Sequence, residues 1–504
     1  MNAVTKVTAD KRKLLLFAIL AAWLIFNGIL LVLHESWRDE ANVWLIARDL
    51  SPAELIRQIK WQGHPCLWYF LVMPFAKAGL PFRTICVISY GVMAAAAAVF
   101  VFRAPFSPLT KALCLASPFF SYYYPVIARN YCLIALLLIL LAACHSRRDA
   151  SPLLYGLLLG LLVQADTIAI VTAGMISFMW LFDAVCRSVR EKTKHALVQA
   201  AKGLWIPAAS LAFWAVQFAG IGGSAEYHPN DLGLQELWDQ CRYFAGHILT
   251  RMTGFDALGD RLLMLLFLVT AVVLSLRIGD LFPALTVAAA FAFETVFSSI
   301  IYELHIWHHI TLCFVLIWFL WLGCSSRQAP ASVLKAKLPR LLAEALLIVL
   351  SISMFLRWNA PEETSSLRNA WSGRYSDSVR TAAFIRGHVA PDSRIFVTHV
   401  AESTPVQAYL GRAYTFYYAG TLERVSFADY NEQQSAGISY ADFLSGMNAD
   451  PDAPEEIYLL RSASDCLEDV PDGAADDWEL LYETEETTAR GEEYRLYRLK
   501  RDLL

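Results

Sequence analysis

Long apolar runs separated by short polar segments occupy the first 358 residues of the chain. Most runs span roughly 16 to 22 residues, the length that a helix needs to cross the ~30 Å hydrocarbon core of a bilayer. The pattern predicts eleven transmembrane helices, over residues 14–33, 84–102, 111–124, 132–144, 152–165, 168–186, 203–220, 262–276, 281–300, 306–323 and 341–357. We therefore expect a polytopic α-helical membrane protein.

A further apolar run, 66–80, is short and contains Pro74. We expect an interfacial or partly inserted helix here, because a full crossing normally takes ~20 residues. The run follows the first polar stretch, 34–65, which contains a possible amphipathic helix after Asp39 and Glu40. Gly and Pro in the Gly-His-Pro sequence at its end are typical helix breakers.

Basic residues set the predicted orientation of the helices. Lys11, Arg12 and Lys13 precede the first helix and place the N-terminus in the cytoplasm by the positive-inside rule. Most later segments that this count places inside are also basic, for example the one with Arg187 and Arg190. Eleven crossings therefore leave the first polar stretch and the C-terminal residues outside the cytoplasm.

The pattern changes after residue 358, where the apolar runs shorten to strand length and Asp and Glu become frequent. Helices and strands alternate in this part, which indicates a small α/β domain. We predict a transmembrane domain over 1–358 and an extracytoplasmic α/β domain over 359–504. Within the second we expect helices at 376–388 and 404–410, and strands at 394–399, 456–460, 478–482 and 494–499.

Composition agrees with a membrane protein and excludes several other classes. Hydrophobic residues make up 57% of the chain and charged residues 17%, whereas soluble domains carry about 25% charged residues. The ten cysteines lie mostly within apolar runs, and no CxxC pair suggests a metal site. There is no Gly-rich phosphate loop, so neither a nucleotide nor a redox cofactor is indicated, and we expect no nucleic-acid partner.

Ionisable and amide side chains gather at the predicted outer ends of the helices. Such groups are costly near hydrocarbon, roughly 2.5–3.5 kcal/mol at the bilayer centre. They suggest a polar cavity at the outer surface, suited to a substrate that is half lipid and half polar. The residues are Asp39, Glu40, His64, Arg129, Asn130, Tyr131, Gln164, Asp166, Glu303, His305, His308 and His309.

Each candidate also has a structural interpretation. Asp39 and Glu40 could form an ordinary solvated pair, and His64 could serve only to turn the chain. Arg129 could extend toward lipid headgroups, and Asp166 could belong to a turn.

The histidines near residue 308 leave two interpretations open. His305, His308 and His309 have i, i+3, i+4 spacing and so share one face of a helix. The spacing permits metal ligation, but we favour an interfacial cluster alongside Trp307.

Two sequence blocks resemble a known family. The first outer stretch resembles that of family-39-type glycosyltransferases, membrane enzymes of the GT-C class that include protein O-mannosyltransferases and the lipid A aminoarabinose transferase. The second block is similar to an SP…ARPYAL pattern of bacterial members, with Asn130 where Pro is usual. The matching residues are Arg38-Asp39-Glu40-Ala41, Ala47-Arg48, Gly63-His64-Pro65 and Leu67-Trp68-Tyr69, then Ser117-Pro118-Phe119-Phe120 and Ala128-Arg129-Asn130-Tyr131-Cys132-Leu133.

The resemblance implies a polyprenyl-phosphate-linked sugar donor and transfer with inversion. It also implies that the carboxylate at Asp39 acts as base or orients the acceptor, with Glu40 beside it. A lysine that some members use to hold phosphate has no clear counterpart here, and His64, Lys60 or Arg129 are the candidate substitutes.

The leading hypothesis is a glycosyltransferase of the cytoplasmic membrane that transfers a sugar to a cell-envelope glycan, lipid or protein on the extracytoplasmic face. Asp39 and Glu40 are the candidate catalytic residues, and His64, Arg129, Asn130, Tyr131, Asp166, His308 and His309 the candidate substrate contacts. A divalent metal ion stays open as a cofactor. The alternatives are a non-enzymatic transporter, a lipid-binding scaffold or a membrane-anchored sensor.

Overall fold

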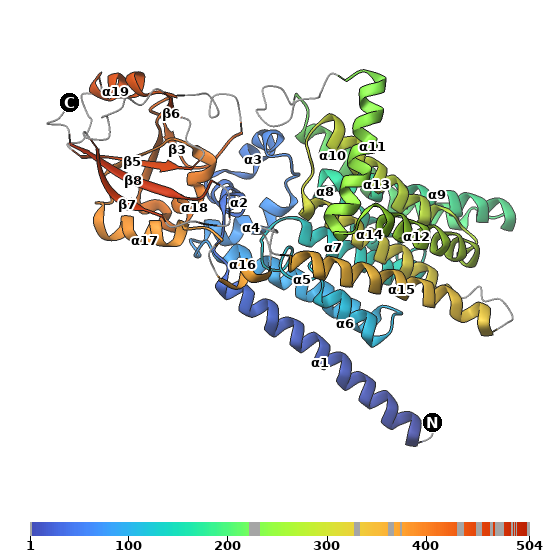
Figure 1. The fold of residues 1–504 in the computed structure, drawn as a ribbon. Coiled ribbons are helices and arrows are strands. Elements are labelled where there is room, and N and C mark those ends of the chain that lie inside the picture. Colours follow the sequence, from blue (N-terminus) through green and yellow to red (C-terminus); the bar gives the residue numbers. More distant parts are fainter. Residues whose placement is uncertain are drawn as a thin grey trace. The chain divides into compact units, whose positions relative to one another are not determined.

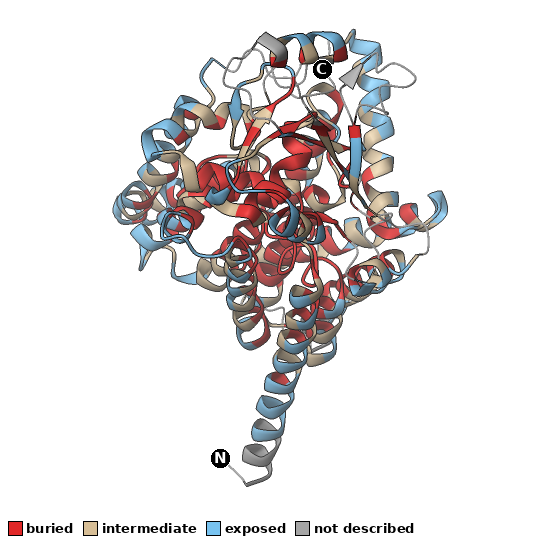
Figure 2. Ribbon diagram, turned by 90° about the vertical axis from the view of Figure 1, so that its left-hand side faces the viewer, coloured by how far each residue is buried: buried red, intermediate tan, exposed pale blue. Residues whose placement is uncertain are grey.

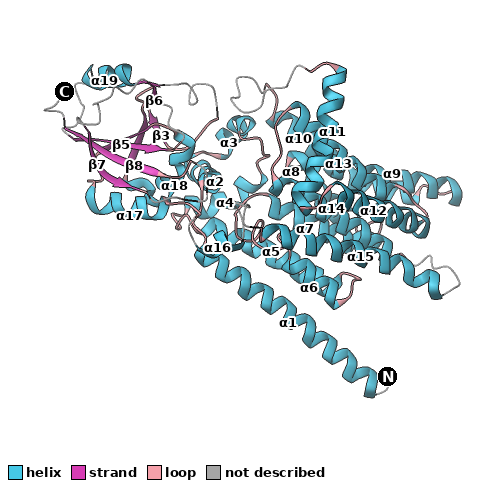
Figure 3. Cartoon of the chain, in the orientation of Figure 1, coloured by secondary structure: helices cyan, strands magenta, loops and turns pink. Residues whose placement is uncertain are grey.

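The structure is a computed structural model of the chain. It describes residues 3–220, 232–326, 333–360, 367–372, 375–430, 438–449, 456–463, 467–468, 478–484, 487, 489 and 491–500. Helices dominate the first part of the chain, and the strands belong to its C-terminal part (Figure 3).

The chain forms two compact units. The first comprises Met1–Leu31, Ser89–Ala219 and Tyr227–Glu363, and the second comprises Val32–Ile88, Gly220–Glu226 and Thr364–Leu504. The first polar stretch of the sequence therefore groups with the C-terminal residues.

Eight helices of the described chain are long and apolar enough to cross a membrane, over Asp10–Leu33, Thr84–Arg103, Thr167–Glu191, His195–Gln217, Ala257–Ile278, Phe282–Ile300, Ile306–Ser325 and Lys337–Trp358. Shorter apolar helices cover Leu67–Lys77, Tyr131–Arg147 and Pro152–Ala165. The helices of this part are labelled α1 (Ala3–Leu33), α5 (Thr84–Arg103), α6 (Pro108–Ala116), α7 (Tyr131–Cys144), α8 (Pro152–Ala165), α9 (Ile170–Glu191), α10 (His195–Gln217), α11 (Leu234–Thr253), α12 (Ala257–Ile278), α13 (Phe282–Ile300), α14 (Ile306–Ser325) and α15 (Val333–Trp358) in Figure 1.

Packing in the first unit uses small residues and one buried helix. A Cβ on Gly156 of α8 would lie 2.2 Å from the carbonyl oxygen of Gly203 in α10, so these two helices approach backbone to backbone, as small residues allow in membranes. Helix α14 is 89% buried over its apolar window and packs against α7, α13 and α15. By contrast, α1 exposes apolar side chains such as Leu14, 71% exposed (Figure 2).

Two predictions for this region are wrong, one of a helix and one of a loop. The helix expected over 111–124 ends at Ala116, and a series of turns follows, with Tyr122 at a φ of 70°. Ser117 and Pro118 interrupt the helix because proline lacks the backbone N–H that a helix needs. The residues after them are apolar but not helical, so hydropathy alone predicted too long a helix.

The outer loop expected over 221–260 contains a helix instead. Helix α11 covers Leu234–Thr253 and buries Ile248, Met252 and Thr253. Its charged and apolar residues alternate with helical periodicity, so it carries no long apolar run, which is why hydropathy missed it. The part of that loop at 221–231 lies outside the described residues.

Helices of the first polar stretch and of the apolar run after it belong to the second unit. They are α2 (Arg38–Asp49), α3 (Pro52–Gln58) and α4 (Leu67–Lys77), with a 3₁₀ turn at Ile59–Trp61. The predicted interfacial segment forms α4, whose 11 residues reach only about 16 Å at 1.5 Å per residue. Helix α4 packs against α2.

The C-terminal part of the second unit is an α/β domain, as predicted. Its main sheet has the order β3-β2-β1-β5-β8-β7; β1 pairs in parallel with β2 and β5, and the remaining pairs are antiparallel. A two-stranded sheet joins β4 and β6. The elements are α16 (Leu367–Ser372), α17 (Ser378–His388), β1 (Arg394–Val397), α18 (Val400–Leu410), β2 (Thr415–Tyr418), β3 (Arg424–Val425), β4 (Ile438–Ser439), α19 (Tyr440–Ala449), β5 (Glu456–Ser462), β6 (Leu467–Glu468), β7 (Trp478–Glu483) and β8 (Tyr494–Lys500).

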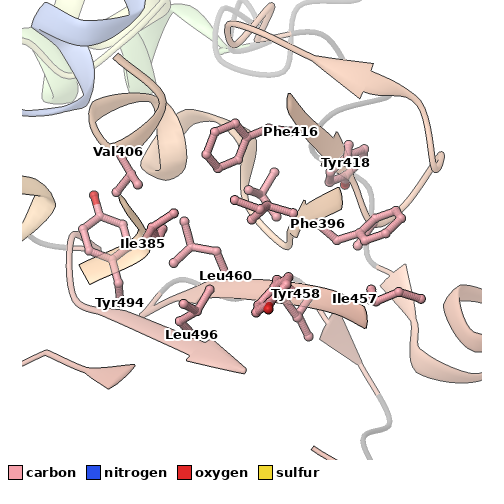
Figure 4. Packing of buried hydrophobic residues seen from close by; sticks show 14 of the residues in the cluster. Ile385, Phe396, Val406, Phe416, Tyr418, Ile457, Tyr458, Leu460, Tyr494 and Leu496 are labelled. Carbon is pink, nitrogen blue, oxygen red and sulfur yellow. The ribbon is translucent and has the colours of Figure 1, made fainter. Parts of the chain in front are cut away.

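The core of this domain lies between the sheet and its helices. Ile385 of α17 and Val406 of α18 are fully buried in one cluster with Phe396, Leu460 and Leu496 of the strands (Figure 4). Strand β1 is buried on both faces, which explains why its sequence reads as a continuous apolar run. The helices and strands predicted in this domain agree with the observed ones to within a few residues, whereas β2 and α19 were not predicted.

Candidate functional site

Asp39 and Glu40 lie in the first turn of α2 and not before the helix. Trp37 has extended backbone angles, and Glu40 at the third helical position accepts a hydrogen bond from the Trp37 N–H at 3.0 Å. This is one half of a capping box. Two carboxylates also suit the positive end of the helix dipole, so the local sequence favours a helix that begins here.

Glu40 is completely buried. One of its oxygens lies 3.0 Å from His34 Nε2 and also accepts the Trp37 N–H. Its other oxygen is 3.6 Å from the Cys86 thiol. The Glu40 carboxylate therefore holds together three segments around the start of α2.

Asp39 has a different environment from its neighbour. Its side chain is 21% exposed, and its carboxylate lies 4.0 Å from the guanidinium of Arg38. The two adjacent carboxylates are thus separated by burial. Asp39 is the one that is partly accessible to solvent.

Arg38 connects this turn to the C-terminal domain. Its guanidinium lies 3.3 Å from Glu402 at the start of α18, and its backbone N–H donates to Glu492 at 2.7 Å. The carbonyl oxygen of Arg38 accepts from the Thr404 hydroxyl at 3.3 Å. Helix α18 packs along α2, so the residues that flank Asp39 are held by the domain far along the chain.

A second connection joins the stretch before His64 to the same domain. The side chain of Asn42 accepts from the Ala428 N–H at 2.7 Å and donates to the Ala428 carbonyl at 3.0 Å. Gln62 donates to the same carbonyl at 2.9 Å. Gly63 then adopts a φ of 72°, and the half-buried His64 follows.

Burial raises the pKa values of two acids near this turn. Desolvation raises the pKa of Glu492 to about 8, against opposing hydrogen bonds from Ser376 and the Arg38 backbone. Desolvation also raises the pKa of Glu35 to about 7, with Arg380 acting in the opposite direction. The second unit therefore holds buried carboxyl groups that bind protons near neutral pH.

The first unit brings together several of the other predicted residues. The Asn130 amide donates to Asp166 at 2.6 Å and to the Ala165 carbonyl at 2.8 Å. Asp166 also accepts the Ile168 N–H at 2.9 Å. Both Asn130 and Asp166 are buried, so the end of α8 is fixed to the start of α7.

Arg129, Tyr131 and His308 form an adjoining group. The Arg129 guanidinium lies 5.6 Å from the centre of the Tyr131 ring, a cation–π distance. The rings of Tyr131 and His308 meet edge to face at 5.3 Å. The His308 Nδ1 accepts the His305 N–H at 2.9 Å, so in a neutral ring the proton resides on Nε2.

His309 contacts the carboxylate of Glu294, which was not among the predicted site residues. Its Nδ1 lies 2.8 Å from Glu294 of α13, and Thr311 donates to the other oxygen of Glu294 at 2.9 Å. All three side chains are buried. A single acid inside an apolar helix was the available signal for Glu294, since such a residue usually has a partner on a neighbouring helix.

Within the described ranges, no group of three or more His, Cys, Asp or Glu side chains is placed to hold a metal ion. The three histidines near residue 308 make hydrogen bonds and ring contacts instead. A requirement for a divalent metal ion stays a prediction.

Comparison with known proteins bears on the fold. No protein-family model and no curated protein matches the sequence. The chain is similar to the apo crystal structure of ArnT from Cupriavidus metallidurans. The match extends over 98% of this chain and 99% of the ArnT chain, with a TM-score of 0.53 and 14% sequence identity. This chain has the ArnT fold.

A second crystal structure of the same ArnT, bound to undecaprenyl phosphate, covers 100% of this chain and 99% of its own, with a TM-score of 0.49 and 14% identity. The predicted polytopic helical architecture with a C-terminal sheet domain agrees with the ArnT fold of the apo structure. Together with its apolar helices, the ArnT fold makes this an integral membrane protein.

The predicted site residues divide between the two units of this ArnT-like fold. Asp39, Glu40 and His64 belong to the second unit, and the other predicted residues, from Arg129 to His309, belong to the first. Sequence reasoning missed the partners Glu402, Glu492 and Ala428, because nothing local marks residues that lie hundreds of positions from α2.

An apolar cavity of about 280 Å³ completes the features of the first unit. Its lining comes from α11, α12, α13, α14 and α15 and includes Phe267, Phe291 and Leu316. Phe291 precedes Glu294 by one helical turn, and Leu312, also in the lining, follows Thr311 directly. The cavity walls are therefore continuous in sequence with the Glu294–His309 group.

Proposed function

We propose that this protein is a membrane glycosyltransferase that moves a sugar from a polyprenyl-phosphate carrier to a cell-envelope acceptor. The acceptor class is a glycan, lipid or protein, and transfer takes place on the extracytoplasmic face of the cytoplasmic membrane. The observation that carries the proposal is the unequal pair at the start of α2, in which Glu40 is buried and bonded while Asp39 is accessible beside Arg38.

In this proposal the Asp39 carboxylate is the general base. It accepts the proton of an acceptor hydroxyl as that oxygen attacks the anomeric carbon, and the bond between this carbon and the phosphate oxygen breaks. Polyprenyl phosphate leaves with the bonding electrons, so the products are the glycosylated acceptor and the free carrier. General-base catalysis contributes typically 10²–10⁴-fold to a rate.

Glu40 has a positioning role in the same scheme. One of its oxygens is bonded to both His34 and the Trp37 N–H, and the other faces the Cys86 thiol, so it orients the turn that presents Asp39. Glu402 and Glu492 hold Arg38 from the other side.

The lipid part of the donor is supported by two features. ArnT, whose apo structure shares this fold, has been crystallised with undecaprenyl phosphate. The first unit offers an apolar cavity lined by five helices, suited to an isoprenoid chain. We assign Arg129 and His64 as candidate contacts of a phosphate group. The Arg129 guanidinium is a cationic hydrogen-bond donor, and the His64 ring donates a hydrogen bond whether it is neutral or protonated. Asn130, Tyr131, Asp166, His308 and His309 are candidate contacts of sugar hydroxyls.

The test is transfer of radiolabelled sugar from polyprenyl-phosphate donors by full-length protein in proteoliposomes. We expect Asp39→Asn to lower the rate by about 10²–10⁴-fold with an unchanged thermal melt. The matched control is Asp442→Asn on α19, an exposed aspartate, which should transfer at the wild-type rate.

Equal transfer by wild type and Asp39→Asn would remove Asp39 from the mechanism and direct attention to Glu40 or Asp166. No turnover with any donor, together with retained binding of the lipid carrier, would support the lipid-binding scaffold instead.

A further inference from the structure

A basic cavity of about 530 Å³ lies within the second unit. Its walls come from the C-terminal ends of α2 and α4, the turn between α4 and α5, and residues of α17, α18 and the turn that follows. None of the described lining residues is an acid. Five are cationic: Arg48, Lys77, Arg83, Arg386 and Arg412.

Lys77 and Arg412 both contact the last turn of α2, which itself carries Arg48. Lys77 Nζ lies 3.4 Å from the carbonyl oxygen of Arg48, and the Arg412 guanidinium lies 3.3 Å from the same oxygen. Cations near a helix C-terminus are favourable because of the helix dipole. Both contacts are longer than the usual 2.9–3.0 Å for N–H···O bonds, however, and one terminal carbonyl cannot offset the charge of five cations.

The acids near these cations lie outside the described lining of the basic cavity. Asp49 accepts two bonds from Arg48, at 2.8 and 2.7 Å, and lies 3.6 Å from Arg412. It lines an adjoining cavity of about 520 Å³, to which Arg424 adds another cation. Arg83 and Arg386 donate to the backbone carbonyls of His34 and Tyr409, which carry no formal charge. Lys77 also interacts electrostatically with Glu54, and Arg83 with Glu35, but none of these acids is among the described lining residues of the basic cavity.

A second part of the wall of the basic cavity is apolar and aromatic. The rings of Phe82 and Tyr409 meet edge to face at 5.0 Å, and Trp44 lies 6.2 Å from Phe82. Leu80, also in the lining, is 45% exposed. A ligand that suits both parts of the wall has an anionic head and an apolar stem.

Arginine favours a particular kind of anion. Its planar guanidinium matches phosphate bidentately, and several arginines around one small cavity are typical of phosphate recognition. Helix α2 rises about 1.5 Å per residue, so Arg48 lies roughly 13 Å and Trp44 roughly 7.5 Å along α2 from Asp39. Asp39 does not line the cavity, so the cavity is distinct from the proposed catalytic turn.

We propose that the basic cavity binds a phosphate group, as the headgroup of a phosphorylated lipid or as free phosphate. Arg48, Lys77, Arg386 and Arg412 hold the phosphate, and the Trp44, Phe82 and Tyr409 wall contacts the adjoining stem. The proposal does not depend on glycosyl transfer, because binding is measured directly.

The experiment is equilibrium binding to the full-length protein in neutral-detergent micelles. Three probes are compared: radiolabelled dodecyl phosphate, dodecanol and inorganic phosphate. The test variant combines Lys77→Gln, Arg386→Gln and Arg412→Gln, whose side chains are all exposed, so their loss leaves no buried charge without a partner. The control combines Arg57→Gln, Arg495→Gln and Arg498→Gln, which removes the same charge elsewhere in the unit.

We expect wild type and control to bind dodecyl phosphate more tightly than dodecanol. The test variant should lose affinity for dodecyl phosphate on the order of tenfold or more, since it loses three charge-assisted donors. Displacement by millimolar inorganic phosphate would identify free phosphate as a ligand. Failure of inorganic phosphate to displace the probe would identify the lipid headgroup.

Two results would overturn the proposal. The first is a test variant that binds dodecyl phosphate as tightly as wild type does. The second is wild-type protein that binds dodecyl phosphate no more tightly than dodecanol. Loss of sugar transfer in Asp39→Asn with unchanged phosphate binding would separate this cavity from the proposed catalytic turn.

Discussion

At the scale of single residues, burial distinguishes Asp39 from Glu40 although they are neighbours with the same charge. Glu40 is completely buried and bonded to His34 and the Trp37 N–H. Asp39 is partly exposed beside Arg38. The sequence names both as candidates, but a helix turn directs successive side chains about 100° apart, and only packing decides which of them is enclosed.

Alanine substitutions should separate the two roles. Glu40→Ala removes the acceptor of two buried donors and leaves a cavity, so we expect it to lower the free energy of unfolding by about 2–4 kcal/mol. Asp39→Ala removes a partly exposed ion pair with Arg38, worth about 0–1 kcal/mol. Thermal melts of the two variants in the same micelles measure the difference, and equal melting temperatures would contradict it.

At the scale of elements, the predictions succeeded where periodicity is local. Strands β1, β5, β7 and β8 appear where alternating or continuous apolar runs predicted them. Helix α11 was missed because a helix with a mixed surface has no apolar run, and the helix over 111–124 was overextended because apolar turns resemble a helix in hydropathy. The short β2 was missed as well.

A glycine between β7 and β8 supports the contact between α2 and α18. Gly491 has a φ of 88°, and a Cβ there would lie 2.0 Å from Glu402 Oε1. We expect Gly491→Ala to destabilise the protein by roughly 1–2 kcal/mol from backbone strain alone and to displace Glu402 from Arg38.

The matched control for that substitution is Gly387→Ala in α17. A Cβ there meets nothing within 4 Å, so the change should stabilise the helix by roughly 0.5–1 kcal/mol. Thermal melts of both variants give the comparison. A Gly491→Ala protein that melts with the wild type would show that Glu402 is not held in this way.

At the scale of the whole molecule, the first polar stretch groups with the C-terminal residues. Arg38 donates to Glu492 across 454 positions of sequence, and its guanidinium reaches Glu402 across 364. The C-terminal domain therefore supports the proposed catalytic turn. We infer that its role includes positioning Asp39.

The buried acids make stability depend on pH. The pKa of Glu492 rises from 4.5 to about 8 in the folded protein because of desolvation. The folded state therefore binds more protons than the unfolded state over this range, and stability falls as pH rises from 4.5 to about 8. Each pKa unit corresponds to about 1.4 kcal/mol, and Glu35, with a pKa of about 7, acts with the same sign.

Thermal melts of full-length protein at pH 5 and pH 8 test this dependence. We expect wild type to melt at a lower temperature at pH 8. Glu492→Gln, which cannot ionise, should lose much of the difference. A Glu492→Gln protein with the same pH dependence as wild type would rule out Glu492 as its source.

Hydropathy and residue periodicity are local properties, so the amino-acid sequence was enough to predict the membrane class, most helices and strands, and the position of the acidic turn. The three-dimensional packing was needed to show that Glu40 is enclosed while Asp39 is accessible, that Glu294 contacts His309, and that five cations line one cavity. These features depend on contacts between residues far apart in the chain. Burial and charge pairing arise from such contacts, and the local sequence pattern does not predict which distant residues will make them.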